Sequence, residues 1–147
     1  MPGVFASLFM VPDRMKKLLL VTAVLEAGAG FALLGFPSAA MRLLFGVPLD
    51  TAATVVLGRM TGAALLALGV ACWPAGGDPK SRAAKGVVAG MLVYNLAVVV
   101  LFTYAGAGLG LHGLLLWPAV ILHAAMTVWC GIHLGNKWID AGKKAQS

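Results

Sequence analysis

Four long apolar segments alternate with short polar or glycine-rich stretches along the chain. The first covers residues 18–36, and Glu26 is its one charged side chain. A helix rises about 1.5 Å per residue, so about 20 apolar residues cross the roughly 30 Å core of a bilayer. Each segment is close to that length. The pattern therefore predicts four transmembrane helices, over residues 16–36, 52–73, 83–104 and 114–135.

Residues 38–45, between the first and second spans, predict a short amphipathic helix. Met41, Leu44 and Phe45 fall at positions i, i+3 and i+4 and share one face, whereas Arg42 points elsewhere. An apolar face of this kind is typical of a helix that lies on the membrane interface.

Capping residues indicate where these helices begin and end. Ser38 is the expected N-cap of the short helix, and Gly46 is its expected stop. Asp50 or Thr51 is suited to cap the second span, and Ser81 the third.

The composition assigns the chain to the membrane class. Hydrophobic residues make up 61% and charged residues 11%, against about half and a quarter in soluble domains. The 19 glycines suit membrane helices, whose backbones approach closely at small residues. We therefore predict an all-α, polytopic membrane four-helix bundle with a short interfacial helix, forming one domain over residues 1–147.

The net charge of +6 comes from short basic clusters beside the spans. This arrangement suits membrane topology and not a groove-binding face, so no nucleic-acid partner is expected. Four spans put both termini on one side, and by the positive-inside rule the more basic side is cytoplasmic. We predict a bacterial inner-membrane protein with cytoplasmic termini. Arg42 lies on the opposite side, and the cytoplasmic side carries Arg14, Lys16, Lys17, Lys80, Arg82, Lys85, Lys137, Lys143 and Lys144.

Three stretches lie outside the spans. Residues 1–13 are apolar but short and lack a basic start, so they do not predict a cleaved signal peptide. They are either an interfacial segment or a result of the choice of start site, since Met10 and Met15 are alternatives to Met1. Residues 105–113 predict a glycine-rich loop that contains His112. Residues 137–147 are polar and predict a frayed tail.

Each span carries one polar residue at similar depth: Glu26, Arg59, Asn95 and His123. Counted from the span ends opposite the termini, the four lie within about 5 Å of one another along the membrane normal. A lone charge at a span centre costs about 2.5–3.5 kcal/mol on insertion scales. We therefore predict an intramembrane polar cluster in which Glu26 pairs with Arg59. Such a cluster either fixes which helices are neighbours or forms a proton-linked or ligand-binding site.

The fourth span presents a second set of polar residues on one face. His123, Thr127, Cys130 and His133 recur at steps of three or four residues. Thr127 and Cys130, with Tyr94 of the third span, are candidates to face a ligand. Their spacing matches no tight metal motif, so no metal site is predicted. No cofactor is predicted either, although a quinone or a lipid would suit these side chains.

Glycines indicate where helices pack closely. The second span carries Gly58, Gly62 and Gly69, and the third carries Gly86 and Gly90. Small residues at these spacings form close-packing faces. They serve the bundle itself, a homo-oligomer or another subunit.

The stretch GRMTGAALLALGV at residues 58–70 resembles the arginine- and glycine-containing helix of the DoxX-like group of small bacterial membrane proteins. The resemblance extends over residues 16–134 and includes four spans with a short amphipathic segment after the first. It implies cytoplasmic termini and, for some members, a link to quinone-dependent oxidoreductases or redox maturation. Here the arginine lies on the second span and not early in the chain, and the group's redox cysteine pair is absent.

Three functions remain open. Short loops and glycine faces favour a non-catalytic accessory subunit of a larger membrane complex, and a quinone- or electron-transfer-linked complex is one option. Its partners would be membrane lipids and other subunits or further copies of this chain. Glu26 would instead suit a small proton-coupled transporter or channel, and Asn95 and His123 would suit a quinone or lipid head group. No catalytic set is visible, so an enzyme is the least favoured class.

Overall fold

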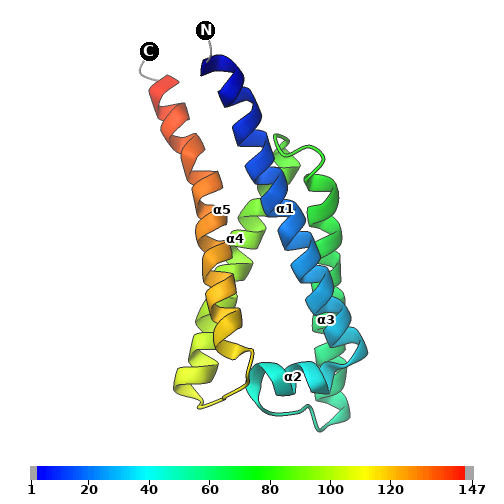
Figure 1. Ribbon diagram of the computed structural model, residues 1–147. Coiled ribbons are helices and arrows are strands. Elements are labelled where there is room, and N and C mark those ends of the chain that lie inside the picture. The colour runs from blue at the N-terminus through cyan, green and yellow to red at the C-terminus, as the bar shows by residue number, and fades with distance from the viewer. Residues whose placement is uncertain (1–2, 145–147) are drawn as a thin grey trace.

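The computed structural model describes the backbone of residues 3–144 and the side chains of residues 14–135, and this part is all-helical (Figure 1). Its elements are α1 (Gly3–Gly35), α2 (Pro37–Phe45), α3 (Ala52–Ala75), α4 (Arg82–Thr103), the π-helical turn η1 (Tyr104–Gly108) and α5 (Leu116–Lys144). The segments long and apolar enough to cross a membrane are Arg14–Gly35, Ala52–Ala75, Arg82–Gly108 and Leu116–Gly135. The predicted fold class, an all-α membrane four-helix bundle, is confirmed.

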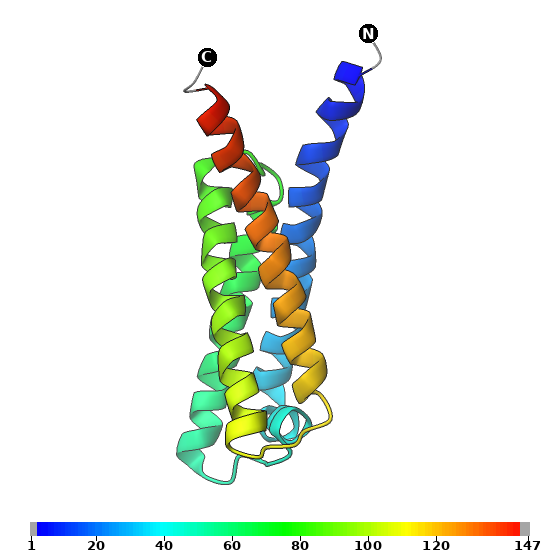
Figure 2. The same cartoon turned by 90° about the vertical axis from the view of Figure 1, so that its left-hand side faces the viewer.

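The long helices associate as two pairs, α1 with α3 and α4 with α5, and contacts between the pairs are sparse. Figure 1 shows the pairs diverging toward one end, where α2 runs across between them. Both described chain ends lie at the other end, which we call the terminal end (Figure 2). The bundle therefore has a terminal end and an α2 end.

Glycines bring α1 and α3 together. A Cβ atom added to Gly62 would lie 2.7 Å from the Leu34 backbone nitrogen and 2.8 Å from the Gly30 carbonyl oxygen. A Cβ atom on Gly69 would lie 3.0 Å from the Ala23 carbonyl oxygen. Only glycine permits backbones to approach this closely.

The remaining predicted packing glycines lie elsewhere. Gly58 meets the α2 end, where an added Cβ atom would lie 2.8 Å from Leu49 Cδ1 and 3.1 Å from Pro37 Cβ. Gly86 and Gly90 are exposed on α4, and a Cβ atom at either position would have no neighbour within 4 Å among the described residues. These two glycines do not pack against another helix in the described structure.

Two predicted N-caps are confirmed. Thr51 caps α3 by accepting a 3.2 Å hydrogen bond from the Thr54 backbone nitrogen. Ser81 caps α4 by accepting a 3.1 Å hydrogen bond from the Ala84 backbone nitrogen. Gly46 ends α2 with φ of 81°, a left-handed conformation that favours glycine.

The prediction that Ser38 caps α2 was wrong. The N-cap is Phe36, and Pro37 occupies the first helical position, where its missing N–H and fixed φ cost nothing. Ser38 Oγ instead donates a 2.8 Å hydrogen bond to the Leu49 carbonyl oxygen, eleven residues away. This bond ties the start of α2 to the loop that leads into α3.

The predicted extramembrane stretches are more helical than expected. Residues 3–13 continue directly into the first span as part of α1, although their side chains lie outside the described residues. The expected frayed tail is helical as far as Lys144, since no proline interrupts residues 119–144. The expected loop at 105–113 begins as the turn η1, in which Leu109 N donates to Tyr104 O over 3.1 Å.

Candidate functional site

A pocket of about 620 Å³ lies between the two helix pairs and toward the α2 end. Its walls come from all four long helices, and its lining is mainly apolar. Helix α2 turns Met41, Leu44 and Phe45 into it. These side chains form the predicted apolar face of α2, so that face meets the protein interior.

A polar cluster lines the same pocket: Glu26 of α1, Tyr94 and Asn95 of α4, and His123 of α5. Only 5% of Glu26 and 1% of Asn95 are exposed. The Tyr94 hydroxyl lies beside the Glu26 carboxylate. The structure thus brings together three of the four residues expected to form the intramembrane cluster, and adds Tyr94.

The hydrogen bonds of Asn95 determine which His123 nitrogen carries the proton. Asn95 Nδ2 donates to the Met91 carbonyl oxygen over 2.7 Å, so Oδ1 is the atom that faces His123 Nδ1, also at 2.7 Å. Since Oδ1 only accepts, Nδ1 must donate, and Nε2 of a neutral imidazole is then an acceptor. Among the described residues no buried polar side-chain atom lacks a partner, so the unbonded Nε2 is accessible from the pocket that His123 lines.

An aromatic row connects α2 with this cluster. The rings of Phe45 and Phe102 meet edge-to-face at 5.1 Å between centroids. Phe102 meets His123 at 6.1 Å, and His123 meets Tyr94 at 5.8 Å, both nearly perpendicular. The row runs along the pocket from its α2 end to Glu26, with π faces and edges available to a ligand.

Arg59 lies apart from the cluster. It is exposed on α3, it does not line the pocket, and the described side chains include no ion pair between Arg59 and Glu26. The pocket face of α3 carries Gly58, Thr61 and Leu65. At 100° per residue, Arg59 points well away from that face. The expected pairing of Glu26 with Arg59 is therefore not part of the described structure.

The other candidates of the fourth span have structural partners. Thr127 Oγ1 donates to the His123 carbonyl oxygen over 2.8 Å, and His133 Nε2 accepts from Trp129 Nε1 over 3.1 Å. Cys130 is fully buried in the apolar core and does not line the pocket. Among the described residues no group of three or more potential metal ligands comes together.

Sequence reasoning missed several pocket residues. Thr22 lies one turn from Glu26 on the same face of α1, and this spacing of four was a usable signal. Phe102 gave no signal, because an apolar residue in an apolar span has no distinguishing neighbours. Leu49 gave none either, because it is an apolar residue of the loop between α2 and α3. Their role depends on how the helix pairs diverge.

The pocket can hold a lipophilic molecule with a polar group at Glu26, because its walls are apolar and its polar atoms are gathered at one place. Comparison with known proteins finds no matching family model, no matching curated protein and no matching solved structure. The four membrane-spanning segments make this an integral membrane protein, so such a molecule would come from the bilayer.

Proposed function

We propose that this integral membrane protein binds a small lipid-soluble molecule in the pocket between its helix pairs. The observation that carries the proposal is the pocket itself: about 620 Å³, mainly apolar, with one cluster of polar groups. Ligand sites in proteins have this size and this combination of apolar walls and a few convergent polar groups. Quinones and membrane lipids belong to this class of ligand.

Access from the lipid supports the proposal. The pairs α1–α5 and α3–α4 make few contacts, so the pocket walls are thin there. Leu25 of α1 and Leu122 of α5 line the pocket and are 37% and 42% exposed. A molecule dissolved in the bilayer can therefore enter sideways between the pairs.

Photolabelling tests this function. A phenyldiazirine dissolved in bilayers containing the protein should label residues of the pocket, and excess butylbenzene should suppress that labelling, because pocket sites saturate. Ala29 lines the pocket, whereas Ala32 on the same helix is exposed outside it. Ala29→Phe should remove the saturable labelling, and Ala32→Phe should leave it unchanged. Labelling of the wild-type protein that only rises in proportion to probe concentration would refute the proposal.

A second candidate function is an accessory subunit of a larger membrane complex, as in the DoxX-like interpretation. It is supported by Arg59, exposed within a span, and by Gly86 and Gly90, which leave an open small-residue face on α4. Mass spectrometry after gentle extraction should then find stoichiometric companion subunits. Recovery of the chain alone would count against this role.

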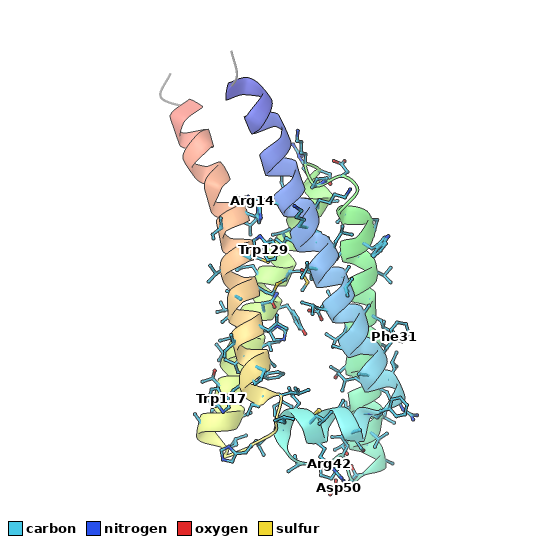
Figure 3. All side chains as sticks on the ribbon, viewed as in Figure 1. Arg14, Phe31, Arg42, Asp50, Trp117 and Trp129 are labelled. Carbon is cyan, nitrogen blue, oxygen red and sulfur yellow. The ribbon has the colours of Figure 1, made fainter. Side chains whose placement is uncertain are left out.

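We propose that the terminal end faces the cytoplasm of a bacterial cell. Arg14 lies toward the terminal end and Arg42 on α2 at the other end (Figure 3), and the predicted excess of basic residues is on the side of Arg14. A fluorescent protein that folds only in the cytoplasm should be bright when fused to the C-terminus. A dark fusion would reverse the orientation.

The transporter alternative uses the same pocket. A carrier must first bind its cargo, and Glu26 is the group in the pocket that can exchange a proton for it. A binding protein and a transporter would therefore both bind their ligand in this pocket.

A further inference from the structure

We propose that the pocket selects lipid-soluble amines, molecules with an apolar body and a protonated ammonium head that binds at Glu26. This inference rests on the proposed function and adds the chemical class of the ligand. It follows from the charge in the pocket, from the direction of its hydrogen bonds and from its aromatic lining.

The charge comes first. Glu26 is the one carboxylic acid among the described residues that line the pocket, and none of them is a lysine or an arginine. The pocket also contains one histidine, His123. Glu26 is nearly fully buried, and Arg59, its expected counter-charge, is exposed outside the pocket. A buried carboxylate is unfavourable unless it is protonated or paired with a cation. An ammonium ligand would supply that cation.

Two of the three threonines that line the pocket, Thr22 and Thr61, donate their hydroxyl proton within their own helix. Thr22 Oγ1 donates to the Leu18 carbonyl oxygen over 2.9 Å, and Thr61 Oγ1 donates to the Leu57 carbonyl oxygen over 2.9 Å. Each hydroxyl has one proton to donate and two lone pairs. Both therefore present acceptor sites to a ligand.

The polar cluster shows the same bias. Asn95 Nδ2 donates to the Met91 carbonyl oxygen, and His123 Nδ1 donates to Asn95 Oδ1. The Tyr94 hydroxyl lies beside Glu26. What remains open to a ligand is His123 Nε2 and the carboxylate oxygens of Glu26, which accept. An ammonium head provides up to three N–H donors, whereas a quinone presents carbonyl acceptors and a phospholipid presents a phosphate that Glu26 would repel.

The aromatic row favours a cation as well. Phe45, Phe102 and Tyr94 line the pocket between α2 and Glu26. A cation held within about 6 Å of an aromatic face is attracted by the ring quadrupole. Apolar parts of the ligand would lie against Leu44, Leu49 and the same rings.

Four matched probes test this inference. They share a phenylbutyl body and differ in the head: 4-phenylbutylamine, 4-phenyl-1-butanol, butylbenzene and 4-phenylbutanoate. Binding is measured by titration calorimetry at pH 7.5 to the full chain in phosphatidylcholine nanodiscs, and the heat from empty nanodiscs is subtracted. We expect the amine to bind about tenfold or more tighter than the alcohol, the alcohol tighter than the hydrocarbon, and the carboxylate weakest.

Two variants locate the effect. Glu26→Gln keeps the side-chain shape and removes the charge, so it should abolish the advantage of the amine over the alcohol. Asp50→Asn removes an exposed carboxylate beside α2 that does not line the pocket, so it should leave the ranking unchanged. If Glu26→Gln does not fold, the ranking of the four probes on the wild-type chain still decides the matter.

The outcomes separate this inference from the function on which it rests. Equal affinity for the amine, the alcohol and the hydrocarbon would refute amine selection and leave a general lipophile pocket. Binding of the carboxylate as tight as that of the amine would refute it too. Failure of all four probes to bind would instead overturn the proposed function.

Discussion

The terminal end and the α2 end of the bundle are built from the same four long helices but are packed in opposite ways. At the terminal end Leu18 is 1% exposed and Cys72, Val88 and Cys130 are fully buried, so side chains fill the space between the helices. At the α2 end the same helices enclose a pocket of about 620 Å³. The filled core and the pocket therefore occupy separate halves of one small bundle.

Helix α2 accounts for much of this difference. It contacts α1 and α3 on one side and α5 on the other. Leu115 N donates to the Leu43 carbonyl oxygen over 2.9 Å, and the rings of Phe45 and Phe102 are in contact. A helix that occupies the space between the pairs keeps them apart, so α2 is both the spacer and the end wall of the pocket.

The largest contrast should come from truncating a leucine at each end. Leu18→Ala should lower the free energy of unfolding by about 2–5 kcal/mol, because it opens a cavity in a filled core. Leu122→Ala should cost less than about 1 kcal/mol, because Leu122 is 42% exposed and borders an existing pocket. Unfolding in mixed micelles measures both values. Equal losses would show that the two ends do not differ in packing.

A smaller effect is expected where α1 crosses α3. Gly62→Ala should destabilise the protein by about 1–3 kcal/mol, since the added Cβ atom would lie 2.7 Å from backbone. Gly90→Ala is the matched control. The Cβ atom that it adds has no neighbour within 4 Å, so the free energy of unfolding should change by about 0.5 kcal/mol or less. The same unfolding assay compares them. A tolerated Gly62→Ala would mean that the crossing is looser than described.

The smallest effect is expected from the hydrogen bond that joins the start of α2 to the loop before α3. Ser38→Ala removes the 2.8 Å hydrogen bond to the Leu49 carbonyl oxygen and should cost about 0.5–1.5 kcal/mol. Because this bond is local, hydrogen exchange should accelerate in residues 46–51 and stay unchanged in α4. Exchange that rises throughout the bundle would show that α2 supports the terminal end as well.

Much of the architecture was determined by the sequence alone. The sequence predicts features that depend only on residues close together along the chain. These are the four apolar segments of membrane-spanning length, the amphipathic residues 38–45 and the caps at Thr51 and Ser81. The polar residues Glu26, Asn95 and His123 were also found, because a polar side chain inside an apolar span is conspicuous.

Only the tertiary structure decided which sides of the helices meet. A span that is apolar all round shows no inward face, so the rotation of each helix cannot be read from its periodicity. Arg59 therefore matched Glu26 in depth yet lies on the exposed side of α3, and Tyr94 occupies the place beside Glu26. The pocket likewise depends on tertiary packing, because it forms where α2 holds the two helix pairs apart. No pattern within a single helix predicts such a space.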